Sequence, residues 1–512
     1  MSSSQMDRRH FLKLGGAFSV LGAGAPFALQ MAAAGTAAAQ SATDYKALVC
    51  IFLLGGNDAH NTVLATDSGS WSRYFAARNT GSDPIALMPP GTAPTAPGAT
   101  SPVTGRVATA STPEAWGGVL PIAPRTAQPV PGGSGTRTFA LHPFMTGAKA
   151  LFDANRLAVV ANVGTLIQPT TKAQYAAKSV SLPRALFSHN DQQSTWQAGA
   201  VEGARSGWGG LMGDLLASGN GSNSLFTAVS TSGSAVFLSG RSVVQYQMTT
   251  AAQPALVVNG ATASTLFGSS VGPARLREII QDTTASNSLL AADYATVTGR
   301  SLNSATTLNG AFATGAATTV MAVPTYVNPV TGVAETNSLA VQLNAVARMV
   351  ASSSALGLKR QVFYVGLGGW DTHDFQNRNQ ANLLAKVSHA LAYFDIALST
   401  IGGADHRGRV TTFTASDFSR TFNTNGDGTD HAYGASHFVM GGAVKGGEIY
   451  GRFPTFGINN ANEDVVGNNF LPNMSVDTIG ATIGRWFGVS ESNLDLVFPN
   501  LKNFDRNAGF ML

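Results

Sequence analysis

Charged residues are scarce in this chain of 512 residues: Asp, Glu, Lys and Arg together make up 12%, against roughly 25% in typical globular proteins. A hydrophobic fraction of 44% and a formal net charge of +4 exclude a disordered chain, because disorder combines low hydrophobicity with high net charge. The Lys and Arg residues are too sparse to form the basic stripe that neutralises phosphates. The composition therefore indicates a folded protein with no nucleic-acid partner.

Cysteine and long apolar runs are also nearly absent. Cys50 is the only cysteine, which excludes an intramolecular disulfide. Because Cys50 lies in the apolar run 47–54, we expect a buried side chain rather than a reactive thiol. After the first 39 residues, no stretch approaches the roughly 18 apolar residues that a membrane-spanning helix needs. We therefore expect no stable membrane span in the mature protein.

The N-terminus carries an export signal. Residues 7–13 read Asp-Arg-Arg-His-Phe-Leu-Lys, which matches the twin-arginine pattern. A weakly hydrophobic segment rich in Gly and Ala follows, and Ala37-Ala38-Ala39 offers a cleavage site. The sequence predicts a signal peptide over residues 1–39, the twin-arginine translocase as a partner during export, and a periplasmic or secreted mature chain, 40–512. The alternative, an uncleaved membrane anchor, is disfavoured by the glycines and by Pro26.

The mature chain alternates between strand and helix patterns, which predicts an α/β fold with a largely parallel sheet. Four nearly continuous apolar runs are typical of strands covered on both faces: 47–54, 157–163, 361–367 and 409–414. Helical spacing is clearest at 144–152, 379–400 and 475–487. Two stretches interrupt the pattern. We expect a loop insertion near 88–138 and an inserted subdomain near 219–337.

Carboxylates follow three of the predicted strands. Asp58 comes after the first, Asp371 after the third and Asp417 after the fourth. Because the carboxyl ends of parallel strands share one edge of a sheet, these groups should converge. Like charges so close together require a cation or a raised pKa. His373 and His431 lie beside carboxylates and support a metal, although any one Asp after a strand can equally be a helix cap.

A second candidate segment, 186–199, is predicted as a loop that enters a helix. At the helix N-terminus the hydroxyl of Ser188 would lie beside unpaired N–H groups, which favour an anionic substrate and an alkoxide. Two interpretations stay open, a nucleophile and a simple helix cap. His189 and Asp191, in the same segment, are alternative metal ligands.

Motifs over essentially the whole mature chain resemble those of the domain-of-unknown-function family 1501, a family of mostly exported bacterial proteins. They are Arg-Arg-x-Phe-Leu-Lys at the start, Leu-Gly-Gly-Asn-Asp from 54, Ser-His with Trp-Gln at 188–197, Gly-Trp-Asp-Thr-His from 369, Ser-Asp-Phe-Ser-Arg-Thr from 416 and Gly-Thr-Asp-His-Ala-x-Gly from 428. This family is in turn similar to the alkaline phosphatase and sulfatase superfamily, which implies a three-layer α/β/α sandwich with metal ligands at the strand ends and long insertions.

The resemblance also implies roles for single residues. Ser188 would be the nucleophile, and Arg420 would hold the anion of the substrate. The implied ligands of a divalent metal (Zn, Mn, Mg or Ca) are Asp58, Asp371, His373, Asp417 and His431, with His189, Asp191 and Asp430 as further candidates. Phe418 stands where the superfamily often has a histidine, which argues against a second metal.

The sequence thus predicts an exported metal-dependent hydrolase of phosphate or sulfate esters, acting on a small anionic ester that the family does not identify. The alternative, from a different functional class, is a non-catalytic exported binding or surface-assembly protein that retains the fold.

Overall fold

The structure is a computed structural model that describes residues 44–512, except 256–257, 259, 285–287, 458–462 and 467–468. The signal peptide predicted over residues 1–39 lies outside this part of the chain. Within it, no helix is long and apolar enough to cross a membrane.

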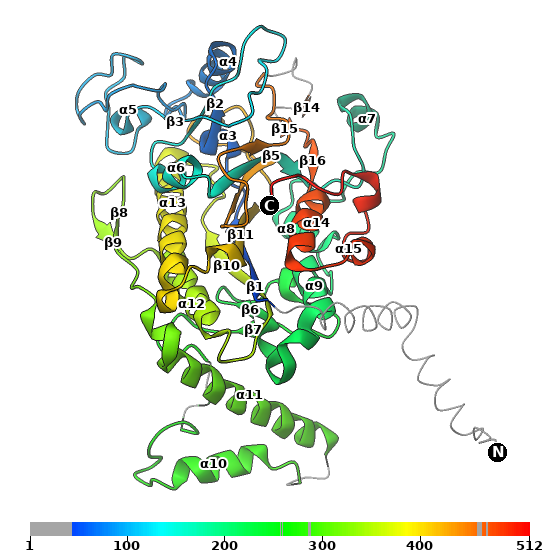
Figure 1. Cartoon of the computed structure of the whole chain (residues 1–512). Coiled ribbons are helices and arrows are strands. Elements are labelled where there is room, and N and C mark those ends of the chain that lie inside the picture. Colours follow the sequence, from blue (N-terminus) through cyan, green and yellow to red (C-terminus); the bar gives the residue numbers. More distant parts are fainter. Residues whose placement is uncertain (1–43, 256–257, 259, 285–287, 458–462, 467–468) are drawn as a thin grey trace, which may run out of the picture.

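A nine-stranded sheet forms the centre of the molecule (Figure 1), in the order β13-β5-β12-β11-β1-β10-β6-β7 with β16 paired to β5. Its strands are β1 (Lys46–Leu54), β5 (Leu157–Gly164), β6 (Ala228–Ser230), β7 (Tyr246–Gln247), β10 (Arg360–Gly368), β11 (Val410–Ser416), β12 (Ala435–Met440), β13 (Ile449–Tyr450) and β16 (Met474–Ser475). Only β12 runs antiparallel to its neighbours. The prediction of a largely parallel sheet is therefore confirmed.

Side chains of β1 alternate between two hydrophobic cores, because successive residues of a strand point to opposite faces. Val49 and Ile51 pack with α6 (Thr146–Asp153), α12 (Ser338–Ser352) and α13 (Gln376–Thr400). Cys50 and Phe52 pack with the helices of the other face, which are α8 (His189–Ala198), α9 (Trp208–Leu216), α14 (Val476–Phe487) and α15 (Glu491–Val497). Helices on both faces confirm the three-layer α/β/α fold, and Cys50 is buried as predicted.

The register of β1 brings the chemistry-bearing loops together. Leu54 pairs with Gly368 of β10, and Leu53 pairs with Ser416 of β11. Because all three strands are parallel and end at matching positions, the segments that follow them start side by side at one edge of the sheet.

The remaining elements lie around this sandwich. They are α3 (Ala59–Thr62), β2 (Val63–Ala65), α4 (Ser68–Arg78), α5 (Pro113–Trp116), β3 (Leu120–Ile122), β4 (Phe139–Leu141), α7 (Lys172–Ala177), α10 (Gly272–Gln281), α11 (Leu289–Ala313), β8 (Tyr326–Val327), β9 (Ala334–Glu335), β14 (Asp464–Val466) and β15 (Asn469–Phe470). The predicted loop region 88–138 contributes β3 to a small antiparallel sheet with β2 and β4.

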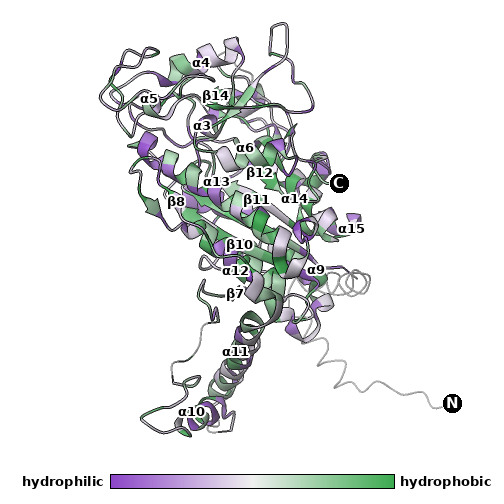
Figure 2. Cartoon of the chain, turned by 60° about the vertical axis from the view of Figure 1, so that its left-hand side comes forward, coloured by the Kyte–Doolittle hydropathy of each residue, from purple (hydrophilic) through white to green (hydrophobic). Residues whose placement is uncertain are grey.

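The boundary expected for an inserted subdomain at 219–337 needs correction. Its first part supplies β6 and β7, which belong to the central sheet because β6 pairs in parallel with β10, Val229 opposite Phe363. A later part, α10 and the first half of α11, projects as an arm (Figures 1 and 2), whereas Ala305, Leu308 and Phe312 in the second half of α11 belong to the hydrophobic core.

Candidate functional site

A glycine pair after β1 allows three loops to meet at the sheet edge. Gly55 and Gly56 have φ of +122° and +87°, a region that favours glycine. A Cβ on Gly55 would lie 2.5 Å from the backbone nitrogen of Asp371, and one on Gly56 would lie 2.5 Å from the ring of Phe418. The N–H of Gly55 donates to the Asp417 carboxylate at 3.2 Å. Only glycine permits this approach of the loops after β1, β10 and β11.

His189, the first residue of α8, faces Asp417 across this edge. Its Nδ1 donates to Oδ2 of Asp417 at 2.7 Å. Since a carboxylate only accepts, Nδ1 carries the hydrogen, and in the neutral imidazole Nε2 then presents a lone pair. Asp417 also accepts from Nε2 of Gln193 at 2.9 Å. The hydrogen bond from His189 to Asp417 raises the pKa of His189. Nε2 of His189 is buried and has no hydrogen-bond partner among the described residues.

Two further histidines present Nε2 in the same way. His431 donates from Nδ1 to the carbonyl of Phe187 at 2.7 Å, and His373 donates from Nδ1 to Oδ1 of Asp430 at 3.1 Å. Their Nε2 atoms lie 3.0 Å apart. Two lone pairs at this distance repel each other unless a proton or a metal cation lies between them. Burial lowers the pKa of His431, and the charge of Arg420 adds to this effect, which disfavours the proton.

The carboxylate of Asp371 completes the group. Its Oδ1 lies 3.1 Å from Nε2 of His373 and 3.3 Å from Nε2 of His431, and its Oδ2 lies 3.5 Å from Nε2 of His189. Burial raises the pKa of Asp371, but the hydrogen bond and charge of Arg420 outweigh burial and hold the pKa below its usual value. We call His189, Asp371, His373 and His431 the histidine–aspartate cluster.

The donors of the cluster fit a divalent metal. Three imidazoles and one carboxylate suit zinc or another borderline cation. Zn–N bonds of about 2.0–2.1 Å in a tetrahedron place ligand atoms roughly 3.3 Å apart. The separation between the Nε2 atoms of His373 and His431, and those between Asp371 and each of the three histidines, are 3.0–3.5 Å. Each Nδ1 is held by an acceptor, as is usual for metal-binding histidines. The side chain of Asp371 is 47% exposed, so one side of the cluster is open to solvent.

Asp58, predicted as a ligand, does not join the cluster. Both of its carboxylate oxygens accept from the guanidinium of Arg78, and Oδ2 also accepts from Nε2 of Gln376 at 2.6 Å. The side chains of Asp58 and Arg78 are 0% exposed. Burial raises the pKa of Asp58, but the charge of Arg78 holds it below its usual value. The cation that balances the charge of Asp58 is the guanidinium of Arg78 and not a metal. The prediction that Asp58 is a metal ligand is corrected accordingly.

Asp417 and Arg420 occupy supporting positions rather than the predicted ones. Asp417 lies behind His189, with its side chain fully buried. Arg420 is also fully buried and donates to Oδ1 of Asp371 at 2.7 Å, to the carbonyl of Gly55 and to both oxygens of Thr429. Arg420 therefore orients Asp371, and its guanidinium is not free to hold a substrate anion as expected.

Ser188 lies between Phe187, which contacts the cluster, and His189, which belongs to it. Its hydroxyl donates to Oδ2 of Asp191 at 2.8 Å and makes no cap hydrogen bond to the backbone of α8. The preceding residue, Phe187, bonds His431, and the following residue is His189. Asp191 accepts from Ser188 and from the N–H of Glu202, and Asp430 accepts from His373. Asp430 thus contacts a member of the cluster, whereas Asp191 contacts Ser188, which lies next to it in the chain.

Sequence reasoning missed three partners. Gln193 follows His189 by four residues, which places both on one helix face, and this spacing was a usable signal. The residue pattern could not predict the other two partners. Phe187 has a φ of +72°, and its carbonyl bonds His431; Arg78 is fully buried beside Asp58.

Comparison with known proteins gives one match. A family model described as "Protein of unknown function (DUF1501)" matches residues 45–491. No curated protein and no solved structure matches the chain.

Proposed function

The chain belongs to the DUF1501 family, and we propose that it is a metal-dependent hydrolase of phosphate or sulfate esters that acts outside the cytoplasm. The observation that carries the proposal is the convergence of three imidazole Nε2 atoms on the carboxylate of Asp371. A divalent cation bound there would polarise the ester and offset the charge of the anion.

The start of α8 supports an anionic substrate. His189 is the first residue of this ten-residue helix, and no side chain caps its first turn in the described part of the chain. Unpaired N–H groups and the positive end of the helix dipole favour an anion at this point. With Arg420 engaged by Asp371, the helix start supplies the attraction that Arg420 does not.

Ser188 is the proposed nucleophile, with Asp191 as the acceptor of its proton. We expect Ser188→Ala to lower ester turnover at least about 100-fold, while metal content and the thermal midpoint stay unchanged because the hydroxyl caps no backbone group. Elemental analysis, calorimetry and steady-state assays measure the three quantities. Ser492→Ala, at an exposed position, is the control. Full turnover by Ser188→Ala would remove Ser188 from the mechanism.

The proposed activity is tested on mature protein loaded separately with zinc, manganese, magnesium or calcium. Each form is assayed against aryl phosphates and aryl sulfates. We expect turnover with at least one metal and loss of turnover on chelation. Full metal occupancy without turnover of any ester would overturn the hydrolase proposal.

That outcome would favour the second candidate, an exported binding or surface-assembly protein. The projecting arm supports this alternative, because its segments expose large apolar side chains. The most exposed are Leu289 (88%) and Leu290 (83%) at the start of α11, and Phe267, shortly before α10, is 99% exposed. Such side chains on an arm suit contact with another macromolecule.

We also propose export through the twin-arginine pathway. Changing Arg8 and Arg9 together to lysine is expected to leave unprocessed precursor in the cytoplasm, because the arginine pair is the recognised element. Cell fractionation with immunoblotting measures the distribution, and Arg205→Lys in the mature chain is the control. Normal processing and export of the double variant would contradict this route.

A further inference from the structure

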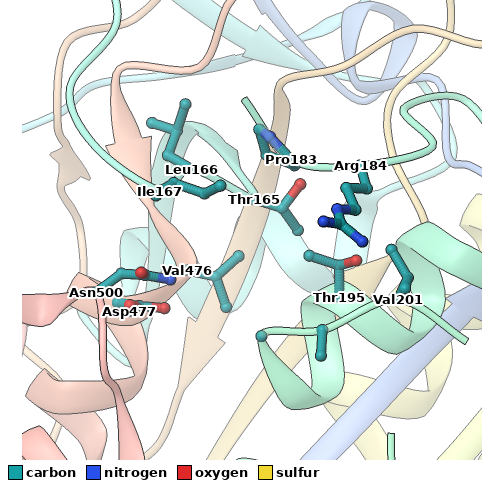
Figure 3. Close-up of a pocket in the computed structure, with 12 residues that line it drawn as sticks. Thr165, Leu166, Ile167, Pro183, Arg184, Thr195, Val201, Val476, Asp477 and Asn500 are labelled. Carbon is teal, nitrogen blue, oxygen red and sulfur yellow. The ribbon is translucent and has the colours of Figure 1, made fainter. Parts of the chain in front are cut away.

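A cavity of about 300 Å³ lies next to α8 (Figure 3), and no residue of the histidine–aspartate cluster lines it. It is bounded by the segment after β5, the end of α8 and the start of α14. Gln193 of α8 faces Asp417, whereas Thr195, two residues later, is turned by about 200° around the helix and faces the cavity. The two sites therefore use different sides of α8.

One end of the cavity holds a buried carboxylate. Asp477, in the first turn of α14, is 8% exposed, and its Oδ2 has no hydrogen-bond partner in the part of the chain that the structure describes. Burial raises the pKa of Asp477 to about 7, although a backbone hydrogen bond from Asn500 acts in the opposite direction. A buried carboxylate oxygen without a donor is costly. A ligand with a cationic donor would remove that cost.

The other end of the cavity is basic and the middle is apolar. Figure 3 places Asp477 with Asn500 on one side and the exposed Arg184 with Thr195 on the other. Leu166, Ile167 and Val476 also line the cavity. The lining therefore changes from acidic through apolar to basic along one direction.

We propose that this cavity binds a small zwitterion whose ammonium group contacts Asp477, whose carboxylate contacts Arg184 and whose apolar body packs on Leu166 and Val476. A single α-amino acid carries both charges on one carbon, whereas the acidic and basic residues of this cavity lie on opposite sides of it (Figure 3). The matching chemistry is an amino carboxylate with its charged groups separated by an apolar stretch, as in an ω-amino acid or a short apolar peptide.

The test is calorimetric titration of the mature protein with three probes of equal chain length: 6-aminohexanoate, hexylamine and hexanoate. A parallel titration with dialanine distinguishes a peptide from an ω-amino acid. Protein is first treated with a chelator, so that no probe carboxylate binds a metal at the cluster. We expect saturable binding of 6-aminohexanoate or dialanine at one site per chain. Each probe with a single charge should bind at least about 10-fold more weakly.

Two variants locate the binding. Asp477→Asn and Arg184→Gln should each weaken zwitterion binding at least about 10-fold. Asp505→Asn, at an exposed acid outside the cavity lining, should leave it unchanged. Asp477→Asn removes an unpaired buried charge, so a circular dichroism spectrum like that of the wild type is expected. No saturable binding of either zwitterion, equal binding of all probes, or undiminished binding by Asp477→Asn would each overturn the proposal.

Discussion

Replacing Arg78 with methionine is expected to lower the free energy of unfolding by about 3–5 kcal/mol, because the change leaves the carboxylate of Asp58 buried without its cation. Arg78 also donates to the carbonyls of Thr421 and Phe422, which lose their partner in the same variant. Urea denaturation measures the loss. Arg275→Met, which breaks an exposed pair with Glu278, should cost only about 0–1 kcal/mol.

The same pair has a predictable pH dependence. The pKa of Asp58 is lower in the folded protein than its ordinary value of 3.8, so the unfolded chain binds more protons in acid. The Arg78–Asp58 pair therefore contributes fully to the free energy of unfolding above the pKa that Asp58 has in the unfolded chain. This contribution is lost as the pH falls through the pKa of Asp58 in the folded protein. Arg78→Met should lose less stability than the wild type over this acid range.

Asp58→Asn separates a structural role from a metal ligand. We expect this variant to be destabilised like Arg78→Met, while its folded fraction binds as much metal as the wild type, because Asp58 already pairs with Arg78 and Gln376. Unchanged stability together with lost metal would instead identify Asp58 as a ligand.

Replacing His431 with alanine is expected to abolish metal binding and ester turnover together. This change removes one of the two Nε2 atoms that lie 3.0 Å apart and opens the cluster on that side. Asp417→Asn gives a graded comparison, because it keeps His189 but weakens the hydrogen bond that orients it. Its metal affinity should fall roughly 10–100-fold and recover at high metal concentration.

The control for both variants is His406→Ala, a histidine outside the cluster. Competition with a chromophoric chelator measures the affinities. Wild-type affinity in His431→Ala would contradict the assigned geometry, and an unaffected Asp417→Asn would show that His189 needs no orienting partner.

The sequence was sufficient to predict the strands and helices that carry strong local patterns. The long buried strands show nearly unbroken apolar runs, and α14 begins at Val476, directly after Ser475, whose hydroxyl accepts from the N–H of Asp477 as a cap should. β6 and β7 have three and two residues, too few for any periodic signal. The reversed direction of β12 was equally hidden, since an apolar run reads the same in either orientation.

The residues of the candidate site were likewise predictable only in part. Position after a strand end brings Asp371 and His373 to this edge, because parallel strands share it. His431, in the long connection between β11 and β12, was singled out only by its place next to Asp430, and it lies beside Asp371. Position after a strand end does not distinguish the residues of the cluster from Asp58 and Asp417, which also follow strands but pair with other side chains. Which carboxylate faces the opening depends on distant partners. Arg78 satisfies Asp58 from α4, and His189 covers Asp417 from α8.

Elemental analysis of the purified mature protein tests most directly whether the histidine–aspartate cluster binds a metal ion. Wild type, Asp371→Ala and Asp374→Asn are compared after identical loading and dialysis, since Asp374 is an exposed acid of the same loop that does not belong to the cluster. The account predicts one metal ion per chain in the wild type and Asp374→Asn, and none in Asp371→Ala. A metal-free wild type, or equal metal content in all three proteins, would contradict it.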